Sequence, residues 1–179
     1  MFVGLITLLP LADIAADRVE QLLDAAFGPD RHGRTAYKIR AGMPVVPAMS
    51  FAALDGTTLL GTIQAWPAAI VSATGADPVT LVGPVAVMPE AQGKGIGQKL
   101  MARLIDAADA GASDAMVMIG DPEYYGRFFG FSAEATGGWD VPGPVERHRL
   151  LARIRRAGGV QAHGLLGPDP DFASRAAAA

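Results

Sequence analysis

The sequence contains no cysteine among its 179 residues. Without cysteine the chain forms no disulfide, offers no thiolate to a metal ion and has no cysteine nucleophile. Its three histidines, His32, His148 and His163, are scattered without metal-ligand spacing, so we predict no metal site. Chemistry that depends on thiols or on a histidine-rich metal centre is therefore excluded from the expectations.

The sequence also has no large excess of charge of one sign. It contains 15 Lys and Arg residues and 18 Asp and Glu residues, which gives a formal net charge of −3. Such a chain has no overall field that gathers nucleic acid or an anionic membrane, so an anionic ligand must bind at a local site. No stretch approaches the roughly 18 uninterrupted apolar residues of a membrane helix. We expect no nucleic-acid or membrane partner and a cytoplasmic location.

The size and the 50% hydrophobic content suit a single large core. We predict one domain over residues 1–166, followed by a flexible C-terminal tail over 167–179. The tail combines proline and aspartate with a run of alanines, a composition that packs poorly. The apolar run 1–12 lacks a basic start and a cleavage site, so we interpret it as part of a first strand.

The first half of the chain predicts a strand, a helix and a hairpin. Residues 2–9 are β-branched and aromatic enough for a strand, and residues 15–27 repeat apolar positions at spacings of three and four, the period of a helix. Two extended segments, 43–53 and 57–66, flank the turn signal Asp55-Gly56. This order indicates an antiparallel meander.

The middle of the chain predicts a βαβ unit. Residues 79–87 form a strand that contains Gly83 and Pro84, and proline cannot donate a ladder hydrogen bond, so the strand should bulge or leave a neighbour there. Apolar residues then recur every four positions over 96–108, and 114–119 reads as a buried parallel strand. Strand, helix and strand in this order favour a right-handed crossover.

The last third of the chain predicts short elements without a regular alternation of strands and helices. A short helix over 122–128 precedes a strand over 129–133, and a helix over 145–157 carries five arginines. A final strand is expected over 160–166. We interpret the basic helix as solvated on its charged faces.

Three alternating glycines lie between the strand 79–87 and the helix 96–108. A helix begins with backbone N–H groups that lack partners and with a partial positive charge, so its first turn binds anions. Gly93, Gly95 and Gly97 permit close approach of a phosphate. A P-loop is excluded because no Ser or Thr follows Lys94, and a dinucleotide fingerprint fails because Gln98 stands where Gly or Ala is needed.

The turn resembles the signature of the GNAT superfamily of N-acetyltransferases, Arg/Gln-x-x-Gly-x-Gly/Ala, at every fixed position. The segments 83–90 and 120–128 resemble one bacterial branch of predicted acetyltransferases. The resemblance implies an α/β fold with a mixed, mostly antiparallel sheet, a βαβ cofactor-binding unit and a splay between strands 4 and 5. It implies acetyl-CoA as cosubstrate, held by these residues: Val85, Ala86, Val87, Gln92, Gly93, Lys94, Gly95, Ile96, Gly97 and Gln98.

The resemblance also implies a tyrosine acid that protonates the leaving thiolate. Tyr125 is the first candidate and Tyr124 the alternative, because both follow the strand 114–119. Tyr125 departs from the family spacing: it lies five residues before Gly130 instead of four, since Phe128-Phe129 contains one more residue. The base is unknown, since the nearby carboxylates fit helix caps or solvated groups better: Asp77, Glu90, Asp121, Glu123 and Glu134. The basic helix offers contact with the 3'-phosphate of CoA, an acidic substrate or RNA as alternatives to solvation.

The resemblance therefore implies direct acetyl transfer from acetyl-CoA to a primary amine of a small molecule, an amino-acid derivative or a protein. The alternative of another class is a catalytically silent acyl-CoA sensor, and a third is a different nucleotide-binding α/β enzyme. Neither the acceptor nor the acyl-chain preference follows from the residues, and a homodimer is one option for the assembly.

Overall fold

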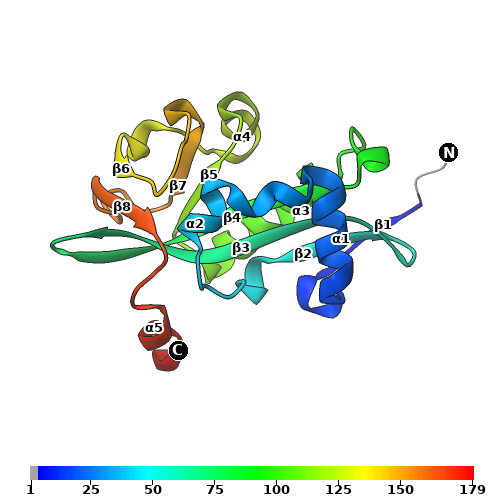
Figure 1. The fold of residues 1–179 in the computed structure, drawn as a ribbon, viewed down its shortest axis with the longest axis horizontal. Coiled ribbons are helices and arrows are strands. Elements are labelled where there is room, and N and C mark those ends of the chain that lie inside the picture. The colour runs from blue at the N-terminus through cyan, green and yellow to red at the C-terminus, as the bar shows by residue number, and fades with distance from the viewer. Residues whose placement is uncertain (1–3) are drawn as a thin grey trace. The chain divides into compact units, whose positions relative to one another are not determined.

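The computed structural model of the protein describes residues 4–179, which form a mixture of strands and helices (Figure 1). The strands are β1 (Ile6–Pro10), β2 (Phe51–Asp55), β3 (Thr58–Ser72), β4 (Gly75–Val87), β5 (Ala115–Ile119), β6 (Gly138–Asp140), β7 (Leu150–Ile154) and β8 (His163–Gly167). The helices are α1 (Ala16–Phe27), α2 (Thr35–Ile39), α3 (Ile96–Ala107), α4 (Pro122–Phe129) and α5 (Phe172–Ala178).

The described residues group into two compact units, and the long strands β3 and β4 contribute to both. The first unit draws on the described residues up to His32, on Val45–Ala65 and on Gly83–Ala112, and the second on Gly33–Pro44, Trp66–Val82 and Ser113–Ala179. The expected single domain over 1–166 stays a prediction.

The first unit is built on an antiparallel meander with a helix on one face. β1 pairs with β2, and β2 pairs with β3 with a register shift between Ala53 and Leu54. The apolar spacing of α1 places its buried residues on one side of the helix, where they pack on the sheet. This cluster consists of Leu11, Val19, Leu22, Leu23, Ala52, Leu54 and Ala86.

Helix α3 approaches β3 and β4 closely at Gly61. A Cβ atom added to Gly61 would lie 2.9 Å from the carbonyl oxygen of Ala86, 3.0 Å from Cγ2 of Ile96 and 3.2 Å from Cδ1 of Leu100. Met88 N donates to the carbonyl oxygen of Leu60 at 2.8 Å, which joins the two strands beside this contact. The missing side chain therefore sets how near the helix lies to the sheet.

The second unit contains the parallel part of the sheet. β4 pairs with β5 in parallel at Thr80↔Met116 and Leu81↔Val117, and β5 pairs with β7 in antiparallel over its whole length. β8 pairs with β3 in antiparallel and with β6 in parallel. The indole of Trp139 is 1% exposed in this core, and its Nε1 donates to the carbonyl oxygen of Gln161 at 2.9 Å.

The predicted βαβ unit and mixed sheet are confirmed, as are the helix over 15–27, the hairpin at Asp55-Gly56 and the short helix from Pro122. The strand predicted over 2–9 lies partly outside the described residues, and its described part contributes to β1. The predicted last strand is displaced by a few residues and becomes β8.

The predicted basic helix over 145–157 is wrong. This segment forms a short helical turn at Arg147–Arg149 and then the strand β7. Leu150 and Leu151 are fully buried in antiparallel pairing with β5, so sheet hydrogen bonds and burial outweigh the local helix preference. The predicted strand over 129–133 is also wrong, because α4 continues through Phe129 and only Ser132 forms a bridge, with Ala152.

The C-terminal tail contains α5. Arg175 Nε donates to Asp169 Oδ2 at 3.1 Å, and Asp169 is only 4% exposed. The flexibility predicted for 167–179 stays a prediction. Within residues 4–179, every helix is too short or too polar to cross a membrane.

Substitution of Gly61 tests the packing of α3. We expect Gly61→Ala to lower the free energy of unfolding by about 1–3 kcal/mol, because the added methyl group meets backbone and branched side chains that cannot yield without moving the helix. Urea denaturation measures the change. Gly137→Ala is the matched control, since no described atom lies within 4 Å of its added Cβ. Equal stability of the two variants would contradict the close approach.

Candidate active site

The turn between β4 and α3 has a backbone that favours glycine. Gly93 has φ 77° and Gly95 has φ 76°, both in the left-handed region that L side chains rarely adopt. Among the described residues, no atom lies within 4 Å of a Cβ added at either position. The glycines are thus required by conformation, and the space above them is open to a ligand.

The start of α3 is uncapped by any side chain. Gly95 is the residue before the helix and has no side chain to accept from the first amides, while Ile96 is 1% exposed and holds the first turn in the core. Gln92 Nε2 donates to the carbonyl oxygen of Val87 at 3.3 Å, which links the turn to the end of β4. The first amides of the helix therefore remain for water or for an anion.

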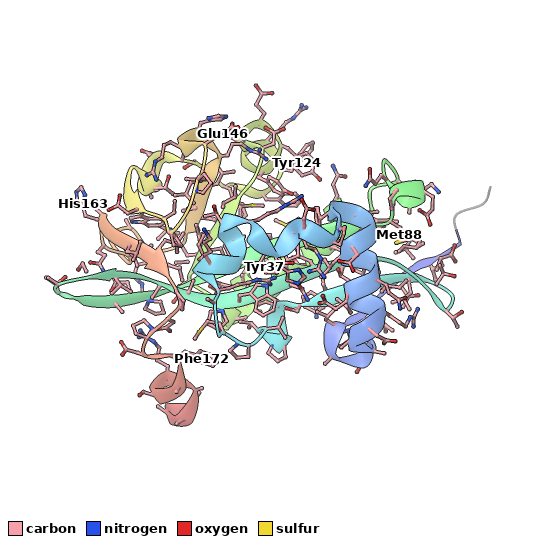
Figure 2. All side chains as sticks on the ribbon, viewed as in Figure 1. Tyr37, Met88, Tyr124, Glu146, His163 and Phe172 are labelled. Atoms are coloured by element: carbon pink, nitrogen blue, oxygen red, sulfur yellow. The ribbon has the colours of Figure 1, made fainter. Side chains whose placement is uncertain are left out.

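All ten residues predicted to bind the cofactor lie in the first unit, on β4, on the turn or on the first turn of α3. Gln92, Gly93, Lys94, Gly95 and Gln98 are exposed, Val85, Val87 and Gly97 are half-buried, and Ala86 and Ile96 are buried. The side chains of these last two are core residues, so only their backbone groups are available to a ligand. Met88, labelled in Figure 2, marks the end of the strand segment.

Helix α4 carries both tyrosine candidates and has well-defined ends. Asp121 Oδ1 accepts from the backbone N–H of Glu123 at 3.0 Å, and Pro122 occupies the first helical position. Gly130 ends the helix in the left-handed conformation, with φ 74°. Tyr124, labelled in Figure 2, packs edge to face with Tyr125 at a ring-centroid distance of 4.9 Å.

The ring of Tyr125 lies directly against Gly120. A Cβ atom at Gly120 would lie 2.6 Å from Cε2 of Tyr125, so only glycine fits beneath the ring. Gly120 is held in turn by Arg149: the Gly120 N–H donates to the Arg149 carbonyl oxygen at 3.0 Å, and Arg149 Nε donates to the Gly120 carbonyl oxygen at 3.4 Å. The place of the ring is therefore determined by the end of β5.

The pKa of Tyr125 is raised above its ordinary value of 10.0. Burial is the largest cause, because it disfavours the phenolate, and the neighbouring Tyr124 and Asp121 add to it, whereas Arg149 lowers the pKa. The hydroxyl group thus stays protonated at neutral pH. A protonated phenol on a rigid helix can donate a proton to a leaving group.

The five carboxylates considered as bases take ordinary roles. Asp121 caps α4, and Asp77 Oδ2 accepts from the backbone N–H of Gln161 at 2.8 Å. Glu90, Glu123 and Glu134 are exposed. Within residues 4–179, no cluster of three or more His, Cys, Asp or Glu residues could hold a metal ion.

Sequence reasoning does not identify Gly120 as the residue beneath the Tyr125 ring or Arg149 as the hydrogen-bond partner of Gly120. Gly120 lies inside the segment 120–128 that resembles the bacterial branch, and its place directly before Asp121-Pro122 was the signal that could have found it. Arg149 lies in the segment that the sequence predicts as a basic helix, so its contact with Gly120 does not follow from the sequence.

A protein-family model and solved structures resemble the chain. The model of the acetyltransferase (GNAT) family matches residues 16–131. No curated protein sequence matches the chain.

Solved structures resemble the chain over nearly its whole length. A GNAT family acetyltransferase from Brucella melitensis, in complex with acetyl-CoA, is 25% identical, has a TM-score of 0.63 and matches 94% of this chain and 99% of its own. A GNAT family N-acetyltransferase from Escherichia coli, in complex with CoA, is 20% identical, has a TM-score of 0.70 and matches 97% of this chain and 93% of its own.

Titration of the tyrosines tests the packing of Tyr125. The chain has three tyrosines, and we expect a titration component above pH 10 that disappears in Tyr125→Phe. In Gly120→Ala this component should move toward pH 10, because the added methyl group displaces the ring into water. Ultraviolet absorbance of tyrosinate against pH measures both effects, with Gly33→Ala as the control, since no described atom lies within 4 Å of its added Cβ.

The raised pKa of Tyr125 also makes the stability of the fold depend on pH. A folded-state pKa above the unfolded value means that Tyr125 stabilises the fold fully below pH 10, and this contribution is lost as pH rises through the folded-state pKa. A Tyr125 component that titrates below pH 10 in the native protein would contradict the packing of this half-buried side chain.

Proposed function

The chain belongs to the acetyltransferase (GNAT) family, and on that premise we propose that it transfers an acetyl group from acetyl-CoA to a primary amine. The observation that carries the proposal is the open glycine turn at the start of α3, which presents unpaired amides to an anion. The CoA-containing structures from Brucella melitensis and Escherichia coli support the choice of ligand.

The residues of the first unit fit a CoA diphosphate. The two left-handed glycines carry no Cβ atom that would block a ligand, and the unpaired first amides of α3 create a positive potential beside them. Lys94 is exposed beside them and adds a positive charge. The backbone of Val85–Val87 would pair with the pantetheine arm, and a backbone N–H near Val87 would stabilise the developing oxyanion.

Acetyl-CoA supplies an activated acetyl group, and the transfer yields an amide and free CoA thiol. The amine nitrogen gains a bond to the acetyl carbon and loses one proton to water, while the thioester C–S bond breaks and the leaving sulfur gains one proton. Tyr125 is protonated at neutral pH, since its pKa lies above the ordinary value of 10.0, and its hydroxyl group is the proposed proton donor. Tyr124 is the alternative donor.

A catalytically silent acyl-CoA sensor is the second candidate. It is favoured by the roles of the five nearby carboxylates, which cap a helix, accept a backbone hydrogen bond or face solvent and thus leave no side-chain base among them. Release of CoA thiol in the presence of an amine separates an enzyme from a sensor. We also propose a cytoplasmic location and no nucleic-acid or membrane partner, and a homodimer stays one option for the assembly.

Replacement of Gly95 tests the donor site. We expect wild-type protein to bind acetyl-CoA and CoA but not NADH, and Gly95→Glu to weaken acetyl-CoA binding by about 100-fold, because a carboxylate occupies the anion site and several charged hydrogen bonds are lost. Calorimetric titration measures the affinities.

Gly56→Glu is the matched control for this variant. Gly56 also has a positive φ, 58°, and open space around its Cβ position, but it lies in the β2–β3 hairpin. Its variant therefore has the same added charge and a similar backbone strain away from the turn. Equal loss of acetyl-CoA binding in both variants, or no binding by the wild type, would contradict the assignment.

Removal of the Tyr125 hydroxyl group tests the acid. We expect Tyr125→Phe to lower kcat by about 100-fold, since a general acid acts in the transition state, and to leave the acetyl-CoA affinity unchanged. Thiol release with an excess of amine measures kcat, and Tyr124→Phe is the control. A loss confined to Tyr124→Phe would assign the role to Tyr124, and no loss in either would exclude a tyrosine acid.

A further inference from the structure

Two polar side chains of β3 are buried in the first unit without partners for their oxygen atoms. Thr62 is 0% exposed and Gln64 is 7% exposed. Among residues 4–179, neither Oγ1 of Thr62 nor Oε1 of Gln64 has a hydrogen-bond partner. Neutral polar atoms in this state are uncommon in folded proteins and require an explanation.

Both side chains point to the same face of the sheet. Residues two apart on a strand share a face, and Thr62 lies directly opposite Ala52 in the β2–β3 register. Ala52 packs in the cluster with Leu22 and Leu23 of α1. The two oxygen atoms therefore face the α1 side, whereas Gly61 faces α3 on the other side.

The pair destabilises the ligand-free fold. A buried oxygen without a partner keeps the full cost of losing water, and an apolar side chain of the same shape avoids that cost. Valine and methionine would fill the same space as Thr62 and Gln64 with no unpaired atom. A ligand that donates hydrogen bonds to both oxygens would account for polar residues at this place.

The position of the pair indicates which ligand. The carbonyl oxygen of Leu60 on β3 accepts from Met88 N at 2.8 Å, and Gly61 lies against the carbonyl oxygen of Ala86. Thr62 is therefore one residue along β3 from the position that faces Ala86. Unpaired oxygen atoms accept hydrogen bonds, and a primary amine carries at least two N–H donors.

We propose that Thr62 and Gln64 form the binding site for the amino group of the acceptor substrate. This inference rests on the proposed function, because it places the acceptor beside the segment that would hold the acetyl donor. Both oxygen atoms are buried, and Gln64 keeps a small exposed fraction whereas Thr62 keeps none, so the amine would enter from the side of Gln64.

A neutral site suits the chemistry of the transfer. Only the uncharged amine is a nucleophile, and burial disfavours the ammonium form when no negative charge faces it. Hydroxyl and carboxamide oxygens accept N–H donors without supplying such a charge. The pair would thus bind the amine and favour its reactive form, which reduces the need for a carboxylate base.

The test uses the full chain with Thr62→Val, Gln64→Met and the double variant. Each single variant should raise the ligand-free midpoint of thermal unfolding by about 2 °C or more, because an unpaired buried atom is removed. Each should also lower kcat/KM for the amine at least about tenfold and leave the acetyl-CoA Kd unchanged. Thr58→Val is the matched control, since Thr58 is exposed on the same strand.

A second measurement needs no turnover. With CoA present, n-butylamine, tyramine and alanine amide are each added at millimolar concentration, and the thermal midpoint is recorded. At least one amine should raise the midpoint of the wild type and of Thr58→Val but not that of the double variant, while the N-trimethylated counterpart, which has no N–H donor, should raise neither.

The outcomes distinguish failure of the amine site from failure of the proposed function. A raised midpoint in the variants with unchanged kcat/KM, or an amine shift that persists in the double variant, would overturn the amine site and leave a water-filled or unpaired core. No shift by any of the three amines in the wild type would overturn it as well. Failure of the wild type to bind acetyl-CoA and CoA would instead overturn the proposed function.

Discussion

The close packing of α3 against β3 is the contact on which the candidate donor site depends. It is possible because Gly61 has no side chain, so Ile96 and Leu100 can approach the strand to within the space that a methyl group would need. Ile96 is the first residue of α3 and is almost completely buried there. The contact that holds the helix on the sheet therefore also determines where its first amides lie.

The turn that leads into α3 follows from the same constraint. Once Ile96 is fixed, the chain must travel from Val87 to the helix through left-handed conformations at Gly93 and Gly95, which glycine adopts without strain. The side chain of Gln92 holds this path by its hydrogen bond to Val87. A rigid backbone with open space above it binds an anion without first being ordered, which saves conformational entropy on binding.

Local signals explain which parts of the fold could be predicted. The turn, the helix that follows it and the hairpin are each specified by residues close in sequence, so their patterns survive folding. The segment that begins at Arg147 is different: its arginines suggested a solvated helix, but Leu150 and Leu151 are buried because β5 lies beside them as a hydrogen-bonding partner. A pairing between strands separated by about thirty residues leaves no local signature.

The candidate site likewise has features that a local motif predicts and features that arise only on folding. The motif identified the backbone of the turn, but burial of the Ala86 and Ile96 side chains, and the contact of Gly120 with Tyr125, arise only in the folded chain. The unpaired oxygens of Thr62 and Gln64 show the limit most clearly, because a polar residue in a strand is unremarkable until its surroundings are known. A fold stabilised only by packing would place apolar side chains there, so these two positions are where selection for binding, rather than for stability, explains the residues best.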